Sequence, residues 1–594
     1  MNKQRLDPHS YYEVGQPRTQ HIQMALKVLF KTHQLQGTAT IRFDGSGPVT
    51  LDTRDLAVKS ISTIRGRAIT FKFGETDAIL GTPLHFTLPQ GETVAVIVYK
   101  TAPNARGLYW LEPAQTLGGR HPFMFSQGQH HHTRSFLPCQ DTASIRFTYE
   151  ALLIVPEDLV GLMAAYSVGR TQRIGNLVRT QWDMPYRIPS YLLAFAVGNL
   201  VSREISHRTR LWGEPEIIQA GEWEFAEMEN YMAIAERTWV PYPWPRFDIL
   251  LLSPYFPYGG MENPMLAFIS SLVVTGDRSG KIIPIHEMLH GIFGNLITNA
   301  TLADFWLNEG WTTYGQMRVL EVLDGTEAVE LIAFLSRIHA QTDKEQCFKG
   351  RPHLSRLVPT IQDEDPDDLV TGIPYFKGYR FLKALEEHVG RTRFDAFTLK
   401  YIQRFAFESI TTEQFFAFTK AHLPGALKAI NYKAWFKTPE VLPAHCPPLK
   451  SSRVDYITQK AKSGQVPEAA DGASWTPREW RLYAESLQRP VAPEFFQELE
   501  NHCGLTEHPN HATRYCVFRM AIESGRVEVL PALDEFMGSM GNVGIVRSLY
   551  AAMVERKDMR EEALAMFRRH RPRYHPIVAD LVKTQVFTKA GLTV

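Results

Sequence analysis

The chain of 594 residues carries 64 basic and 63 acidic side chains, and 44% of its residues are hydrophobic. A chain of this length and composition can bury the cores of several domains. Its net charge near zero gives no electrostatic reason to expect a nucleic acid or an anionic membrane as partner, and no run of eighteen apolar residues predicts a membrane-inserted helix.

The chain start and the cysteines indicate the compartment. Met1–Pro8 lacks the apolar core of a signal peptide. The five cysteines have neither paired nor C-x-x-C spacing, as expected of reduced thiols rather than zinc ligands: Cys139, Cys347, Cys446, Cys503 and Cys516. Both features predict a cytoplasmic protein.

Residues 1–200 are predicted to form an antiparallel β domain. Short alternating segments such as Ala39–Phe43, Thr93–Val98 and Ser144–Tyr149 are separated by Gly, Pro and Asp. The triplet His130–His132 suggests a second metal site, but adjacent side chains point in different directions. We therefore interpret the triplet as a polar loop.

In residues 201–440, helical periodicity dominates after a few strands, and Glu222–Trp239 is predicted to be a helix. The apolar run Ile249–Leu252 predicts a strand. The motif Gly259-Gly260-Met261-Glu262-Asn263-Pro264 follows it. Paired glycines permit close approach of a ligand to the backbone, and Glu262 places a carboxylate beside it. Alone the motif reads as a turn, but the metal motif downstream favours ligand binding.

That metal motif is His286-Glu287-Met288-Leu289-His290, followed after eighteen residues by Glu309. On a helix, residues four apart share a face, so His286 and His290 can bind one ion with Glu309 as the third ligand. Zinc lowers the pKa of water at the open fourth position, and Glu287 can take its proton. An accidental H-E-x-x-H is expected in roughly a few per cent of such chains. The apolar residues around this motif make unpaired His and Glu costly, which favours a zinc site.

Residues 441–474 are predicted to be a linker, because Pro439, Pro443, Pro447 and Pro448 precede a stretch rich in Ala, Gly and charges. Thr476-Pro477-Arg478-Glu479 matches a capping box, and residues 475–594 are predicted to form successive amphipathic helices. The sequence has no fixed-period repeat.

Together, G-G-M-E-N-P and H-E-x-x-H with its distant Glu resemble the M1 family of zinc aminopeptidases. The segments Phe125–Gln129, Leu137–Asp141, Asp365–Asp367 and Ile373–Gly378 are most similar to the branch that contains leukotriene A4 hydrolase and aminopeptidase B. This resemblance implies an α+β multidomain fold with a thermolysin-like catalytic domain and an armadillo- or HEAT-like helical domain. It also implies one Zn²⁺ per chain and peptide substrates with a free N-terminus.

The resemblance assigns roles to individual residues. Gln129 helps Glu262 hold the substrate amine, with Gln127 close by, and Gly259, Gly260 and Met261 bind the substrate backbone. Tyr375 stabilises the tetrahedral intermediate, because a phenol can donate a hydrogen bond to an oxyanion. Asp367 lies at the pocket for the first side chain, where its carboxylate favours Arg or Lys, with Ala and other small or apolar residues behind.

Three departures limit this transfer of roles. Val370 stands where leukotriene A4 hydrolase has a tyrosine that its lipid epoxide modifies. Asn542 and Gly544 stand where the vertebrate enzyme has an arginine and a lysine that bind a substrate carboxylate. Arg547, one helical turn away, can supply such a charge instead.

Three alternatives stay open. A lipid epoxide hydrolase, alone or as a second activity, could use the same zinc and Asp367, and it would need an apolar tunnel. A thermolysin-type endopeptidase shares the zinc helix, but Glu262 opposes it by demanding a free amine. A noncatalytic binding protein is the weakest reading, because every residue expected for turnover is present. The sequence leaves the oligomeric state open, and a monomer suffices for this site.

Overall fold

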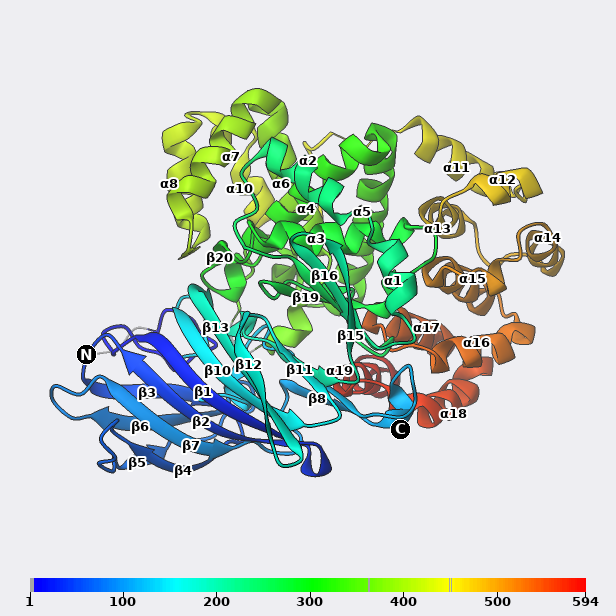
Figure 1. The fold of residues 1–594 in the computed structure, drawn as a ribbon. Helices are drawn as coiled ribbons and strands as arrows, with labels where there is room; N and C mark the ends of the chain where they lie inside the picture. The colour runs from blue at the N-terminus through cyan, green and yellow to red at the C-terminus, as the bar shows by residue number, and fades with distance from the viewer. Residues whose placement is uncertain (1–4, 362–363, 448, 450) are drawn as a thin grey trace.

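The computed structural model describes residues 5–361, 364–447, 449 and 451–594. Three regions follow one another along the chain: a β-rich N-terminal region, a mixed middle region and a helical C-terminal region (Figure 1). The N-terminal strands lie beneath the middle region in Figure 1, and the C-terminal helices lie beside both. Within the described residues, no helix is long and apolar enough to cross a membrane.

The largest sheet of the N-terminal region has the order β12-β13-β10-β1-β2-β7-β4. Neighbouring strands are antiparallel except β1 and β10, which run parallel. The predicted antiparallel arrangement is confirmed for the other pairs of this sheet but not for this one, because the long chain between the two strands permits a crossover. The strands are β1 (Thr19–Leu29), β2 (Gln34–Phe43), β4 (Ala57–Ser62), β7 (Val94–Lys100), β10 (Arg146–Pro156), β12 (Tyr166–Ile174) and β13 (Leu177–Pro189).

Two smaller antiparallel sheets complete this region. One has the order β3-β6-β5, with β3 (Gly47–Thr53), β5 (Phe71–Phe73) and β6 (Thr82–Leu88). The other has the order β11-β14-β9-β8, with β8 (Leu108–Leu111), β9 (Phe123–Ser126), β11 (Val160–Met163) and β14 (Phe195–Gly198). Strand β9 is fully buried and leads directly into the loop that carries Gln127, Gln129 and the histidine triplet.

The middle region begins with a mixed sheet of order β15-β16-β17-β19-β18. The predicted strand Ile249–Leu252 is confirmed as part of β17. Ile249 and Leu251 pack into the core formed with the helices, whereas Leu250 and Leu252 pack into the N-terminal core. The sheet therefore joins the two regions. Its strands are β15 (Val201–Ser206), β16 (Thr209–Gly213), β17 (Asp248–Leu252), β18 (Gly260–Met261) and β19 (Leu266–Ser270).

Helices form the rest of the middle region. The segment Glu222–Trp239, predicted as one helix, is divided by a break at residues 225–227. A small parallel pair joins β20 (Ile297–Asn299) to β21 (Glu408–Ile410). The helices are α1 (Ile218–Glu224), α2 (Met228–Thr238), α3 (Ile282–His290), α4 (Trp306–Asp324), α5 (Thr326–Cys347), α6 (Ile373–Val389), α7 (Arg391–Phe405), α8 (Thr412–His422), α9 (Ala426–Ala429) and α10 (Tyr432–Lys437).

Two glycines allow α4 and α6 to pack closely. A Cβ atom added to Gly310 would lie 2.8 Å from the Cα atom of Gly378, so no other residue fits at Gly310 without moving α6. Helix α4 carries Glu309 and α6 carries Tyr375. The glycine contact therefore sets the distance between the helices that bear these two side chains.

The C-terminal region is helical, and the predicted capping box between Thr476 and Glu479 is confirmed. Two of its helices, α11 and α12, lie within 441–474, and Ile457 of α11 is buried in the C-terminal core, so this segment is structured despite its prolines. Leu331 and Leu335 of α5 join the same core, which attaches this region to the middle one. The helices are α11 (Ser452–Lys462), α12 (Ala469–Ser474), α13 (Pro477–Ser486), α14 (Pro493–Cys503), α15 (His511–Glu523), α16 (Leu530–Gly538), α17 (Val543–Glu555), α18 (Arg560–His570) and α19 (Pro576–Leu581).

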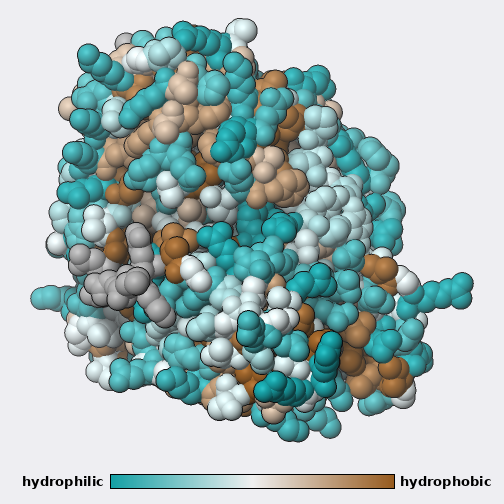
Figure 2. Space-filling model, turned by 90° about the vertical axis from the view of Figure 1, so that its left-hand side faces the viewer, coloured by the Kyte–Doolittle hydropathy of each residue, from teal (hydrophilic) through white to brown (hydrophobic). Residues whose placement is uncertain are grey.

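Hydrophobic side chains at the surface are spread along the chain, and they include Val168, Trp223 and Val322. On the face shown in Figure 2, hydrophobic patches alternate with hydrophilic ones. Scattered apolar side chains are ordinary on protein surfaces and indicate no particular site.

Candidate active site

The three residues predicted to bind zinc converge between the end of α3 and the start of α4. The Nε2 atoms of His286 and His290 lie 3.1 Å apart. Each of them lies 3.3 Å from Oε2 of Glu309. Three donor atoms at these separations can all reach one ion at the usual zinc bond lengths of about 2.0–2.2 Å.

Hydrogen bonds on the far side of each imidazole support this arrangement. His290 Nδ1 donates to the carbonyl of Phe293 over 2.9 Å, and His286 Nδ1 lies 3.2 Å from Oε1 of Gln316. A proton on Nδ1 leaves the Nε2 lone pair free for a metal. Sequence reasoning missed Gln316, although it lies two helical turns after Glu309 on the same face of α4.

Three carboxyl groups lie around the two imidazoles of the cluster. Glu262, Glu287 and Glu309 are all buried. Burial raises the pKa of Glu287 well above its ordinary value. Burial opposes protonation of His290, but Glu309 and Glu262 outweigh it and raise the pKa of His290 to about 10. The imidazoles of His286 and His290 and the carboxylate of Glu309 form a donor set that fits zinc.

The glycine element lies directly against Glu287. A Cβ atom at Gly260 would lie 2.4 Å from Oε1 of Glu287 and 2.6 Å from its Cδ and Cγ atoms. A Cβ atom at Gly259 would meet only the end of the Ile283 side chain, at 3.0 Å. Gly260 therefore leaves the space that the Glu287 side chain occupies.

Two predicted substrate-binding residues from different regions meet beside this cluster. Gln129 Nε2 lies 3.4 Å from Oε1 of Glu262, and the backbone carbonyl of Glu262 accepts a 2.7 Å hydrogen bond from Asn295. Nearby, Gln127 Nε2 donates to the sulfur of the buried Met261 over 3.2 Å. Asn295 is a second residue that sequence reasoning missed, and no motif marked it.

Tyr375 lies in the first turn of α6, next to the three predicted zinc ligands, which we call the zinc cluster. Its ring stacks on His286 with 5.8 Å between ring centroids and 23° between ring planes. Burial, reinforced by Glu309, raises the pKa of Tyr375 well above its ordinary value. The phenol therefore stays protonated and able to donate a hydrogen bond.

The Asp367 carboxylate already has two partners within the protein. His132 Nε2 lies 2.9 Å from Oδ1 and 3.0 Å from Oδ2, and Arg106 donates to Oδ2 over 3.3 Å. Burial alone would raise the pKa of Asp367, but His132 and Arg106 outweigh it and lower that pKa. Sequence reasoning missed both partners. The signal for one was the histidine triplet, which we interpreted as a loop.

Asn542 and the nearby Arg547 both have hydrogen-bond partners within the protein. The side chain of Asn542 accepts a hydrogen bond from the backbone N–H of Ile545 and so caps α17. The guanidinium group of Arg547 lies 3.6 Å from Oδ1 of Asp343 and donates to Gln585 over 3.1 Å. Its charge is therefore largely matched within the protein.

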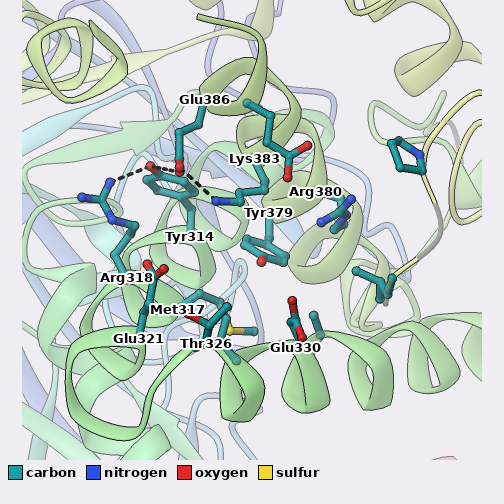
Figure 3. A pocket seen from close by; sticks show the side chains of 15 residues that line it. Tyr314, Met317, Arg318, Glu321, Thr326, Glu330, Tyr379, Arg380, Lys383 and Glu386 are labelled. Atoms are coloured by element: carbon teal, nitrogen blue, oxygen red, sulfur yellow. Dashed lines mark hydrogen bonds and ion pairs between the residues drawn. The ribbon is translucent and has the colours of Figure 1, made fainter. Parts of the chain in front are cut away.

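A cavity of about 480 Å³ lies elsewhere, between α4, α5 and α6 (Figure 3). Glu386 accepts hydrogen bonds there from Tyr314 over 2.7 Å and from Lys383 over 2.9 Å, as Figure 3 shows. Because these groups satisfy one another, the cavity offers no catalytic constellation, and the zinc cluster remains the candidate active site.

Three family models match the chain in order: the Peptidase M1 N-terminal domain over residues 11–192, the Peptidase family M1 domain over residues 223–435, and the C-terminal domain of leukotriene A4 hydrolase over residues 475–586. The chain belongs to the M1 peptidase family. The expected family is thus confirmed, and with it the assignment as a metallopeptidase-family hydrolase.

Full-length relatives place this M1 peptidase within the family. It is 32% identical to leukotriene A-4 hydrolase of Xenopus laevis over 98% of this chain and 100% of that protein. It is 31% identical to leucine aminopeptidase 2 of Aspergillus terreus over 98% of each. Its fold matches yeast leukotriene A4 hydrolase in complex with bestatin at a TM-score of 0.91 and 26% identity, over 99% and 98% of the two chains. These matches confirm the branch and the three-part α+β architecture.

Proposed function

We propose that this M1 peptidase removes single N-terminal residues from peptides. The observation that carries the proposal is the pairing of the half-buried Gln129 with the buried Glu262, with 3.4 Å between Nε2 and Oε1, next to the His286, His290 and Glu309 cluster. A carboxylate and an amide oxygen can together bind a substrate ammonium group. Binding the ammonium there sets the first peptide bond at the zinc cluster.

In the proposed reaction, the zinc ligands, Glu287 and Tyr375 have separate roles. Zinc held by His286, His290 and Glu309 would polarise the first peptide carbonyl and lower the pKa of the attacking water. Glu287 accepts the proton from that water as it attacks, then donates the proton to the leaving amine. The hydroxyl of Tyr375 donates a hydrogen bond to the oxyanion of the tetrahedral intermediate.

Asp367 sets the preference for the first side chain in this proposal. A substrate Arg or Lys must compete with Arg106 and His132 for the Asp367 carboxylate, because both already bind it. The net gain is then that of a partly screened ion pair, about 1 kcal/mol or less. We therefore expect basic first residues to lead over Ala by only about fivefold.

The relatives' names suggest a second candidate, hydrolysis of a lipid epoxide. Beside Pro374 lies an apolar cavity lined by Phe305, Trp306 and Leu369 among others, and its volume is about 20 Å³. A cavity of that size holds about one water molecule. A long lipid tail would have to displace these side chains, so we propose peptide hydrolysis as the main activity.

The test is hydrolysis of aminoacyl arylamides and their N-acetylated counterparts by wild type and Glu287→Gln, with bound zinc measured in both. We expect turnover of the free-amine substrates alone, and a loss of about 10²–10⁴-fold in kcat in the variant with zinc retained. Equal rates on acetylated substrates would contradict exopeptidase selectivity. If zinc-loaded wild type does not hydrolyse the aminoacyl arylamides but does hydrolyse a lipid epoxide, the second candidate is favoured.

A further inference from the structure

A second group of side chains of the types that can ligate a metal lies on the other side of the 129–132 loop. Asp7, His9 and His131 have side chains that are 1%, 3% and 11% exposed. Oδ2 of Asp7 lies 3.2 Å from Nε2 of His131, and Oδ1 lies 3.8 Å from Nδ1 of His9. One donor atom from each residue lies within 4.8 Å of the other two. Two imidazoles and a carboxylate are a donor set that zinc accepts.

Hydrogen bonds prepare His9 as a ligand. Its Nε2 donates to the backbone carbonyl of Glu364 over 3.2 Å, so the proton sits on Nε2 and Nδ1 keeps a free lone pair. Among the described residues, Nδ1 of the buried His9 has no hydrogen-bond partner. Metal-binding histidines typically donate their other nitrogen to a carbonyl or carboxylate in this way.

Asp7 is held in place by its neighbours. Its Oδ2 accepts a 2.8 Å hydrogen bond from the hydroxyl of Thr142, and its Oδ1 accepts one of 2.9 Å from the backbone N–H of His9. Ligating carboxylates are commonly oriented by such second hydrogen bonds. The carboxylate is therefore fixed between the two imidazoles before any ion binds.

Charge and space around the cluster also suit a cation. The buried Arg134 donates to the backbone carbonyl of His9 over 2.7 Å, but its charge is matched by Asp141 at 3.0 Å and by Asp52 at 3.9 Å. Arg54 and Arg106 line a small cavity with His9 and His131, and Arg106 pairs with Asp365 at 3.1 Å. A cavity of about 20 Å³ borders Asp7 and His131. It has room for about one water molecule, which can complete a tetrahedral site.

We propose that Asp7, His9 and His131 bind a second divalent ion, with zinc as the best fit to this donor set. The ion ties the segment before β1 to the loop that carries Gln129 and the Asp367 partner His132. This site is separate from the His286, His290 and Glu309 cluster, and it stands whether or not the protein cleaves peptides.

The experiment counts zinc in purified full-length variants after equilibration in zinc buffer and removal of free ion. We compare wild type, His131→Ala, His9→Gln and Glu309→Ala, with the exposed His207 changed to Ala as the matched histidine control. We expect about two ions per chain in wild type and His207→Ala, and about one in each of the other three variants. The double variant Glu309→Ala, His131→Ala should bind none.

Two results would overturn the proposal. The first is a wild type that binds a single ion and a Glu309→Ala variant that binds none. This comparison does not depend on the folding of any variant at the Asp7, His9 and His131 site. The other is an ion that persists in the double variant, because it would be adventitious. Circular dichroism of each variant identifies misfolding, and His9→Gln provides a second disruption of the site because glutamine can still donate to the Glu364 carbonyl.

Discussion

Gly260→Ala tests the proposed role of Glu287 as general base. Its Cβ atom would lie 2.4 Å from Oε1 of Glu287, about 1 Å short of ordinary van der Waals contact. Rotation of the carboxylate alone gives no relief, because Cγ and Cδ of Glu287 both lie at 2.6 Å. The whole end of the side chain must therefore move by about 1 Å, and a displacement of that size from the reacting groups costs about 10²-fold in rate, or about 2.7 kcal/mol.

The assay is kcat and KM on an alanyl arylamide, with bound zinc and Tm recorded for each variant. Gly259→Ala is the matched control, because its Cβ atom would meet only the flexible end of Ile283 at 3.0 Å. We expect Gly260→Ala to lose activity through kcat while it retains zinc, and Gly259→Ala to stay within about threefold of wild type. Equal losses in the two variants, or activity near that of wild type in Gly260→Ala, would refute the reasoning.

Four other substitutions test amine recognition, the preference for the first side chain, and the pH dependence of stability. Gln129→Ala should raise KM for free-amine substrates about tenfold with little change in kcat, because it removes one hydrogen bond to a charged group; a loss confined to kcat in initial-rate measurements would argue against this role. Asp367→Asn should lower the ratio of kcat/KM for Arg over Ala substrates, and Arg106→Gln should raise it by freeing the carboxylate; unchanged ratios would remove Asp367 from selectivity. Burial lowers the pKa of His575 to about 3 from an ordinary value of 6.5. The folded protein then leaves His575 neutral while the unfolded chain takes up the proton, so stability is lost as pH falls below about 6.5. His575→Asn should flatten the fall of Tm between pH 6.5 and about 4.5, and an unchanged slope would contradict it.

Most of the site geometry that could be predicted from the sequence involves residues that are close to one another in the chain. His286 and His290 lie one turn apart, so helix geometry alone brings them to one ion, and the apolar residues around them predict burial. The apolar pattern goes on past the second histidine through Ile292, Phe293 and Leu296, but α3 ends at His290. The backbone N–H of Gly294 instead bonds to the carbonyl of Ile297, and this turn brings the carbonyl of Phe293 to His290.

Contacts between distant segments could not be predicted in the same way. Asp367 was expected to offer a free carboxylate, but Arg106 and His132 reach it from more than two hundred residues earlier in the chain. The triplet was interpreted as a loop because adjacent side chains point apart. The side chains do point apart, but each contacts a different carboxylate: His131 contacts Asp7 and His132 contacts Asp367.

The proposed exopeptidase selectivity depends on the packing of the N-terminal region against the middle region. Gln129 lies in the loop after β9, and Glu262 directly follows β18. Phe125 of β9 and Phe268 of β19 belong to one hydrophobic core, so burial of that core fixes the side chains of Gln129 and Glu262, the proposed substrate-binding pair, relative to each other. The zinc ligands, by contrast, come from helices of the middle region alone. A change that loosens the shared core should therefore weaken recognition of the free amine before it disturbs the zinc cluster, which means a higher KM at nearly constant zinc content.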